Sequence, residues 1–538
     1  MAVGKEQTMK KTTGRPQPFG AAVEHDRINF SVQVPVGKEC ALLLYRKGKT
    51  RPEARFEMPE EEGVGEVRFL AVQDIDAGKY EYNFEINGEV MIDPYVREIT
   101  GKKEFGRERD LSAHEIRGKL VSPEYDWEDD RRLHLRWDEV VAYSLHVRGF
   151  TKHSSSKVRH KGTYQGVVEK LPYLKELGIN QIQCMPVYEF EDCKKGKVNY
   201  WGYGSAYYFA PKEAYAAGDS AVRELKDMVR ACHREGIEVV LEMPFTEGIP
   251  VQTVLECLRF YMLEYHVDGF VVNPYSVPWE ILCADPFLKE IKLMRKDDAF
   301  QNVMRRFLKG DENMVNDVMW ALYRNSAVDG KFNYITAQTG FTLWDLVSYD
   351  SKHNEANGEN NSDGPDYNYS WNCGAEGPSR KRAVMALRKN QVVNAFFLLL
   401  TAQGTPCILA GDEFYNTQKG NNNVYCQDNE TGWVDWTRLK TDPSLFEFVK
   451  GLIALRKAHP CLHREEELKG LDRTACGVPD VSYHGESAWQ VKNDVSSRQL
   501  GVLYSGTGSG DQECFIAYNM HWIPHTFALP SPGKDRGW

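Results

Sequence analysis

Three polar side chains stand where strand-like runs of the sequence end, at positions that could carry chemistry. The largely apolar run 267–272 stops at Asn273, and Pro274 then ends any extended strand. Glu242 lies at the end of the run VVLEM, and Asp285 lies in ILCADPF. Carboxyl groups at such positions can act as general acids, bases or nucleophiles. Asn273 offers only an amide, which is unexpected at a strand end that serves an enzyme.

The elements that would position these residues alternate between strands and helices. From 138 to 460, strand-like runs such as INQIQCMPV alternate with amphipathic runs such as AVRELKDMVRACHREG. This alternation predicts parallel βα units, and its repetition favours a (β/α)8 TIM barrel over an open sheet. The predicted fold class is therefore α/β. In such a barrel, the C-terminal ends of the strands share one face.

Two β-rich regions flank the predicted barrel. Residues 16–108 form short alternating runs between turn residues, which is typical of an antiparallel β-sandwich. Residues 1–15 are predicted to be a flexible N-terminus, and 109–137 a charged linker. Residues 461–538 return to β patterning and predict a C-terminal β-sandwich.

Composition narrows the class of ligand. The chain has 538 residues and a formal net charge of −10, which argues against nucleic acid or an anionic membrane as a partner. Aromatic residues make up 12%, enough to supply surfaces that stack on sugar-like ligands. The 12 cysteines show no C-x-x-C pair and no zinc spacing, so we expect reduced thiols, no metal and no cofactor. The sequence shows no signal peptide and no long apolar run, and it predicts a cytoplasmic protein.

Several long motifs resemble one known family. The stretches KHNEANGENNSDGPDYNYSWNCGAEGPS, YWGYGSAYYFAPKEAYA and AYSLHVRGFT resemble the isoamylase and glycogen-debranching (pullulanase-like) branch of glycoside hydrolase family 13, the α-amylase superfamily. GRPQPFGAAVEHDRINFSV is similar to its family 48 carbohydrate-binding module, and FIAYNMHWIPHTFALP to its C-terminal sandwich. The family usually has one more strand after the position of GKDRGW, so we expect a truncated C-terminal sandwich. The Asn-rich runs are expected to shape a polar cleft suited to sugar hydroxyls.

The resemblance places catalytic roles at positions that have changed. Members of the family are retaining hydrolases, which need a carboxylate nucleophile and a carboxylic acid about 5 Å apart. The family's nucleophile aspartate is matched by Asn273, and the arginine beside it by Val271. Glu242 takes the Asp position of the third-strand motif. The loop after Glu242 is shortened.

The remaining two catalytic positions are also altered. The stabilising aspartate of the strand-seven motif is matched by Thr339, and the preceding histidine by Gln338. The acid is matched by Asp285, which follows Asn273 by too few residues for the usual intervening helix. We expect Asn273, Asp285 and Thr339 to cluster at the C-terminal face of the barrel, near Tyr203, with Asp285 displaced from the ideal acid position.

The sequence thus keeps the scaffold and loses the reaction centre, which favours a pseudoenzyme that binds α-glucan such as glycogen, starch or maltooligosaccharide. Tyr203 matches the family's stacking tyrosine, and Trp201 is expected to belong to the core. One alternative is an active α-1,6-glucosidase, debranching or amylase-type hydrolase that uses the recruited carboxylates Glu242, Glu247 or Asp285. Another is a scaffold or regulatory subunit that pairs with an active debranching homologue.

Overall fold

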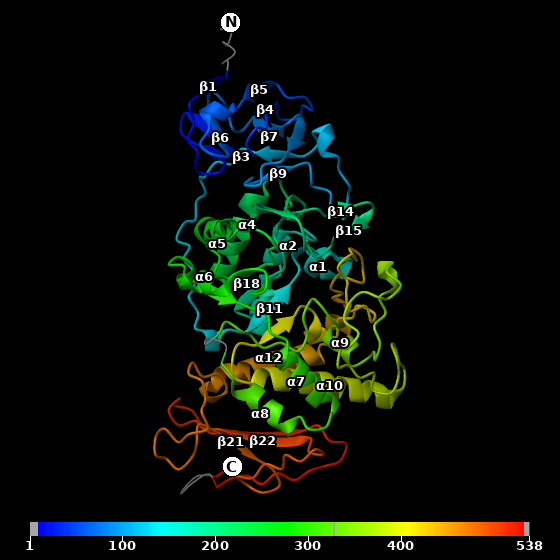
Figure 1. Ribbon diagram of the computed structural model, residues 1–538. Coiled ribbons are helices and arrows are strands. Elements are labelled where there is room, and N and C mark those ends of the chain that lie inside the picture. The colour runs from blue at the N-terminus through cyan, green and yellow to red at the C-terminus, as the bar shows by residue number, and fades with distance from the viewer. Residues whose placement is uncertain (1–8, 326–328, 532–536) are drawn as a thin grey trace.

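The chain forms three regions stacked along one axis. The computed structural model describes residues 9–325, 329–531 and 537–538. Figure 1 shows a β-rich N-terminal region (blue), a central α/β region and a β-rich C-terminal region (orange to red), with the two termini at opposite ends. This order agrees with the predicted one: a β region, a barrel and a second β region.

The N-terminal region is a sandwich of two antiparallel sheets. The first sheet consists, in spatial order, of β1 (Lys10–Thr12), β6 (Val67–Gln73), β3 (Arg27–Gln33) and β2 (Gly20–Val23). The second consists of β5 (Ala54–Glu57), β4 (Cys40–Arg46), β7 (Tyr80–Ile86), β10 (Arg117–Lys119) and β9 (Ile99–Thr100), with β8 (Glu89–Met91) also paired to β7. Apolar side chains from both sheets, among them Phe30, Leu42 and Phe84, form one core. Because β1 and β10 belong to the sheets, the sandwich extends beyond the predicted limits 16–108.

The central region is built on a ring of parallel strands. Its order is β19 (Lys292–Met294), β18 (Gly269–Val272), β17 (Glu238–Met243), β12 (Gln181–Cys184), β11 (Ala142–Leu145) and β20 (Cys407–Leu409). The segment 331–333 closes the ring, because Lys331 bridges Arg295 beside β19 and Asn333 bridges Pro406 beside β20, both in parallel. The sheet is therefore a barrel.

The ring has seven strand positions among the described residues, one fewer than the predicted eight. Between β19 and the closing segment, the described chain forms helices α7 (Ala299–Lys309) and α8 (Val315–Tyr323) and no further strand. The chain is thus shortened within the barrel while the ring stays closed.

Helices cover the outside of the ring. The longer ones are α3 (Leu171–Leu177), α4 (Ala221–Arg234), α5 (Val251–Tyr265), α10 (Arg382–Thr401) and α12 (Ser444–Ala458). α4 illustrates the local logic. Ser220 accepts a hydrogen bond from the N–H of Arg223 and caps its first turn, while Leu225, Met228, Val229 and Cys232 recur at helical spacing and are buried.

Shorter elements complete the central region. Helical turns are α1 (Val147–Lys152), α2 (Tyr164–Val168), α6 (Trp279–Ala284), α9 (Leu343–Leu346) and α11 (Thr437–Thr441). Two small antiparallel sheets pair β13 (Tyr188–Phe190) with β16 (Ala206–Pro211) and β14 (Cys193–Lys194) with β15 (Lys197–Val198).

α10 is a long helix that packs on the other helices around the ring. By length and composition alone it could cross a membrane, a test that buried core helices also pass. It packs against α7, α9 and α12, and its buried residues Val392, Phe396 and Leu399 join the large core around the ring. Its position in the fold explains its apolar composition.

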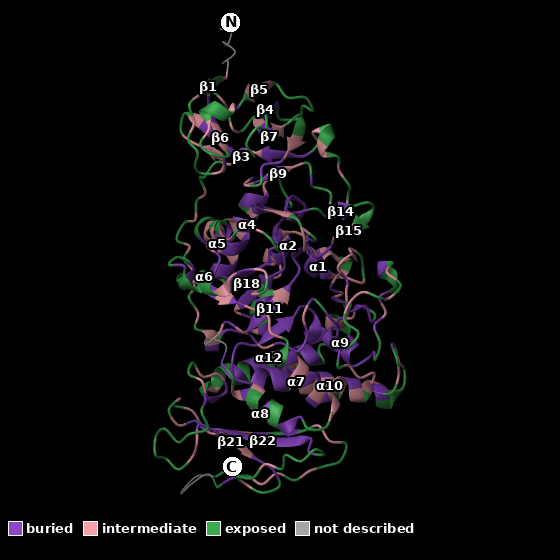
Figure 2. Cartoon of the chain, in the orientation of Figure 1, coloured by how far each residue is buried: buried purple, intermediate pink, exposed green. Residues whose placement is uncertain are grey.

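Apolar side chains form one cluster inside the barrel, and Val271 is one of them. Val240 from β17, Val271 from β18, Met294 from β19, and Phe332 and Tyr334 from the closing segment form one buried cluster. Figure 2 shows this centre of the molecule as buried. An arginine at position 271 would place a guanidinium in this cluster, at a high desolvation cost unless an anion paired with it.

The C-terminal region is a single antiparallel sheet. It consists of β21 (Val481–His484), β22 (Gln499–Tyr504) and β23 (Cys514–Asn519), and residues of all three strands join the core around the barrel helices. The hydroxyl groups of Tyr518 and Thr401 of α10 are 2.6 Å apart. In the described part of 461–538 no second sheet faces this one, so this flank has one sheet instead of the two of a complete sandwich.

Packing inside the barrel gives the first prediction. Val271→Arg should destabilise the chain by about 3–5 kcal/mol, because the new charge would be buried beside Glu242, whose charge Lys296 already balances. Val271→Leu, which adds volume without charge, should cost about 1.5 kcal/mol or less. Melting temperatures of the purified variants should therefore fall by several degrees for arginine and little for leucine. Equal melting temperatures for the arginine variant and the natural chain would contradict a closely packed interior.

Candidate functional site

Residues that follow the parallel strands come to one face of the barrel. Glu242 lies near the end of β17, Asn273 directly follows β18, and Lys296 follows β19. Thr339 follows the closing segment. Because the strands are parallel, these residues share the C-terminal face, where enzymes with this fold place their active sites.

Three side chains meet at one carboxylate oxygen on this face. The Tyr203 hydroxyl donates a hydrogen bond of 2.6 Å to Oε1 of Glu242, and the Lys296 ammonium donates one of 2.9 Å to the same oxygen. Glu242 is only 8% exposed. Its charge is thus balanced by Lys296. Burial first, and then the charge of Glu242, raise the pKa of Tyr203 well above its usual value, so this residue remains a hydrogen-bond donor.

The Asn273 side chain takes part in a turn. Its Oδ1 accepts a hydrogen bond of 3.0 Å from the N–H of Tyr275, and its carbonyl accepts one of 3.0 Å from Ser276. The amide is exposed and starts the short connection from β18 to α6. An asparagine that stabilises its own turn in this way needs no catalytic role to explain it.

The structure corrects the prediction for Asp285. This residue ends α6, which precedes β19, and it pairs with Arg259 of α5 on the outside of the ring, with Arg259 Nε 3.0 Å from its Oδ2. Burial opposes ionisation, but hydrogen bonds from Arg259 and from the backbone N–H groups of Leu288 and Phe287 outweigh it and lower the pKa of Asp285. Asp285 therefore does not join Asn273 and Thr339 at the barrel exit.

Lys296 occupies the place predicted for Asp285, and the sequence analysis missed it. Since β19 runs parallel to β18 and ends at Met294, the strand exit next to Asn273 is the Arg295–Lys296 pair. The Asp-Pro dipeptide at 285 was mistaken for the acid motif because it resembles Glu-Pro. The signal that could have found the strand is the short apolar pair Leu293–Met294.

The loop that carries Gln338 and Thr339 is held from below by Asp412. The Asp412 carboxylate accepts hydrogen bonds from the Thr336 hydroxyl and, at 2.8 Å, from the N–H of Leu343. Gln338 is buried and Thr339 is exposed at the tip. Thr339 brings a hydroxyl and no charge to this loop.

The asparagine-rich runs form a network among themselves. The Asn354 amide donates to Oδ1 of Asn422 at 2.8 Å, and Asn422 donates to Oδ1 of Asn368 at 2.9 Å. Asn421 donates to Oδ1 of Asn357 at 3.0 Å. All five are buried. These amides hold two loops against each other. We predicted that the Asn-rich runs would present polar groups to sugar hydroxyls, but these five side chains are already bonded to one another.

A groove lies beside the Glu242 site. It has a volume of about 790 Å³, and Trp201, Tyr203 and Tyr425 line it together with Lys197 and Asn199. The Trp201 ring is 5.6 Å from that of Tyr203 and 6.3 Å from that of Tyr425. Trp201 is 5% exposed, as expected of a core residue, yet its buried Nε1–H has no hydrogen-bond acceptor among the described residues. The groove therefore offers the rings of Tyr203 and Tyr425 to a ligand, while Nε1 of Trp201 is buried behind them.

The closed ring of parallel strands defines the class of fold, a barrel whose strand exits share one face, and the family model below narrows it. Residues 146–245 match the family model described as alpha amylase, catalytic domain. The pullulanase from Paenibacillus barengoltzii has a similar fold, with a TM-score of 0.72 at 17% identity over 95% of this chain and 88% of that one.

Sequence relatives narrow the class. The chain is 30% identical to isoamylase 1, chloroplastic, of Arabidopsis thaliana, over 97% of this chain and 83% of the relative. It is 32% identical to the glycogen operon protein GlgX homolog of Haemophilus influenzae, over 84% and 86%. The chain therefore belongs to the isoamylase and glycogen-debranching branch of glycoside hydrolase family 13.

This chain is shorter than its relative within the aligned region. The alignment with the Arabidopsis protein runs over 664 positions, whereas this chain has 538 residues. The relative thus carries internal segments that are absent here. The direct connections from β17 to α5 and from β18 to α6 agree with such losses near the barrel exit.

The ion pair at the exit gives the second prediction. Lys296→Met should leave the Glu242 carboxylate buried without its cation and should cost about 1–3 kcal/mol, seen as a lower melting temperature. Adding Glu242→Gln should recover part of this loss, because a neutral amide tolerates the site. Strictly additive effects of the two substitutions would show that the pair is not coupled.

Two buried carboxyl groups behind the exit give the third prediction. Burial raises the pKa of Asp412 and that of Glu413 to about 7, from ordinary values near 4. Between about pH 4 and 7 the folded chain holds protons that the unfolded chain releases, so these groups make stability fall as pH rises. Asp412→Asn and Glu413→Gln should each flatten the decline in melting temperature over this range. An unchanged slope in both variants would contradict the raised pKa values.

Proposed function

We propose that this chain binds α-glucan on a debranching-enzyme scaffold without hydrolysing glycosidic bonds. The observation that carries the proposal is the contact of Lys296 with Glu242. In this contact the Glu242 carboxylate at the barrel exit is paired with a cation. Hydrolysis at this site would need a free nucleophile and a free acid.

Retaining hydrolysis requires two carboxyl groups about 5 Å apart on either side of the bond that is cleaved. Of the predicted catalytic residues, Glu242 alone brings a carboxylate to the exit, since Asp285 pairs with Arg259 elsewhere. Asn273 and Thr339 cannot form a glycosyl ester or stabilise positive charge as a carboxylate does. The groups that remain do not make a nucleophile and acid pair.

Lys296 also has the wrong charge for this reaction. The transition state of glycoside hydrolysis resembles an oxocarbenium cation. An ammonium group 4–5 Å from that cation, at an effective dielectric constant near 20, would raise its energy by about 3–4 kcal/mol where the Glu242 charge does not offset it. The Lys296–Glu242 pair, which is neutral overall, therefore supplies no net negative charge to that cation, beyond the loss of the catalytic groups.

Binding rests on the groove beside the exit. Tyr203 and Tyr425 present rings at its wall, and aromatic faces pack against the apolar faces of glucose units. The N-terminal sandwich, whose sequence resembles a family 48 carbohydrate-binding module, would add a second contact with the polymer.

A second candidate is an active debranching or amylase-type hydrolase. Similarity to a protein named isoamylase 1 favours it, because this chain aligns with most of that protein. It would need Glu242 to leave Lys296 and act with another carboxylate such as the exposed Glu247. Regulation of an active relative is compatible with the binding proposal, since a glucan-binding subunit could hold the polymer for its partner.

The fourth prediction concerns turnover and binding. The purified chain should release no reducing sugar from glycogen, limit dextrin, pullulan or maltooligosaccharides, while it binds maltooligosaccharide with a dissociation constant near 10⁻³–10⁻⁴ M, about −4 to −5.5 kcal/mol. Asn273→Asp should not restore activity, because Val271 and Thr339 leave the new carboxylate unsupported. Reducing-sugar release that Glu242→Gln abolishes would favour the second candidate.

The fifth prediction locates the binding groove. Tyr203→Ala should weaken maltooligosaccharide binding by about tenfold in calorimetry or affinity electrophoresis, because the stacking face is lost. Tyr203→Phe is the matched control: it loses the hydrogen bond to Glu242 but keeps the ring, so its affinity should stay within about twofold. Tyr425→Ala should weaken binding in the same direction. Equal losses for Ala and Phe at position 203 would assign the effect to the Glu242 contact.

A further inference from the structure

Four side chains that commonly bind metals meet where the barrel joins the C-terminal sheet. His459 and Cys461 lie in the turn after α12, around η10 (Pro460–Leu462). Asp511 lies in the loop before β23, and Cys514 is its first residue. Two short pairs of residues, far apart in the sequence, are thereby brought face to face.

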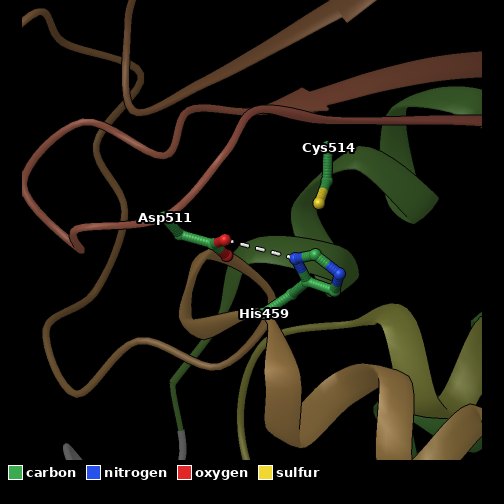
Figure 3. Close-up of side chains that lie close together, drawn as sticks. All are labelled: His459, Asp511 and Cys514. Carbon is green, nitrogen blue, oxygen red and sulfur yellow. Dashed lines mark hydrogen bonds and ion pairs between the residues drawn. The ribbon is translucent and has the colours of Figure 1, made fainter.

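The polar atoms of three of these side chains lie close together. A nitrogen of His459, a carboxylate oxygen of Asp511 and Sγ of Cys514 all lie within 4.8 Å of one another. Figure 3 shows the three side chains pointing toward one another, with a hydrogen bond of 3.2 Å between His459 Nδ1 and Asp511. None of them is fully exposed.

Cys461 adds a second thiol beside this group. Its N–H donates a hydrogen bond of 3.2 Å to Oδ2 of Asp511, which holds Cys461 next to the other three residues. Cys461 is fully buried. The cluster therefore holds two sulfurs, one imidazole and one carboxylate, drawn from two elements of the fold.

This set of donor atoms suits zinc. Zn²⁺ prefers tetrahedral sites of Cys sulfur, His nitrogen and Asp oxygen, whereas Ca²⁺ and Mg²⁺ prefer sites made of oxygen alone. Around a tetrahedral zinc ion the ligand atoms lie about 3.3–3.8 Å apart. The 3.2 Å between His459 and Asp511 is close to that spacing, and Sγ of Cys514 lies within 4.8 Å of both ligand atoms.

We propose that His459, Asp511 and Cys514, with Cys461 as fourth ligand, form a structural zinc site that fastens the C-terminal sheet to the barrel. Four protein ligands would close the coordination sphere, as in structural sites. We predicted no metal from the sequence, because these ligands do not form one continuous zinc motif. The ligands instead come as H-x-C and D-x-x-C, with His459 and Asp511 52 residues apart.

Metal content of the full-length chain tests the proposal. The chain would be purified under reducing conditions, incubated with zinc, desalted and measured by plasma mass spectrometry. About one zinc ion per chain is expected, and close to none in Cys514→Ser or His459→Ala. Cys476→Ser is the control, because this exposed cysteine of the same region lies outside the cluster and its loss should leave the zinc content unchanged. Less than half an equivalent in the natural chain would overturn the proposal.

A cobalt spectrum of the natural chain tests the proposed ligands directly, and this first result does not depend on whether a variant folds. Co²⁺ added to the metal-free natural chain should give visible ligand-field bands of a tetrahedral site and a thiolate-to-cobalt charge-transfer band. Cys461→Ser should weaken the charge-transfer band, and Cys514→Ser should remove it. Absence of the band in the natural chain would overturn the site. So would a Cys461–Cys514 disulfide in the freshly isolated chain, seen as ten free thiols instead of twelve in denaturant.

Discussion

At the exit of the barrel, the ammonium group of Lys296 and the hydroxyl of Tyr203 donate to the same carboxylate oxygen of Glu242. A carboxylate that is buried to this extent needs such partners, because its charge is costly to remove from water. The same contacts fix the Tyr203 ring at the edge of the groove. Charge balance and ring position at the exit therefore depend on one oxygen atom.

The rest of the barrel agrees with the proposal that the exit lacks a nucleophile. With Asn273 in place of an anion, a neighbouring arginine would be an uncompensated charge, and Val271 fills that position as part of the apolar interior. Asp285 supports the outside of the ring through Arg259. The asparagine network and Asp412 hold the loops of the exit in place. The scaffold is maintained by contacts that do not require catalysis.

The order of the three regions and the barrel could be predicted from the sequence, because alternating strands and amphipathic helices leave a strong periodic signal. Positions that directly follow a long apolar strand, such as that of Asn273, could also be predicted from the sequence. The positions of Asp285 and Lys296 could not be predicted, since β19 has only three residues and its exit depends on which short segment pairs with β18. The asparagine network was missed because hydrogen bonds between distant loops have no local sequence pattern. The His459–Cys514 cluster escaped for the same reason.

The central claim is that no residue at the barrel exit forms a covalent bond with a sugar. It can be tested most directly by incubating the chain with an activated fluorinated α-glucosyl fluoride, which traps the glycosyl ester of retaining enzymes, and by measuring the intact mass. We predict an unchanged mass under conditions that label an active isoamylase completely. A mass increase of one fluoroglucosyl unit, mapped by peptide analysis to Glu242 or to another carboxylate at the exit, would contradict the account.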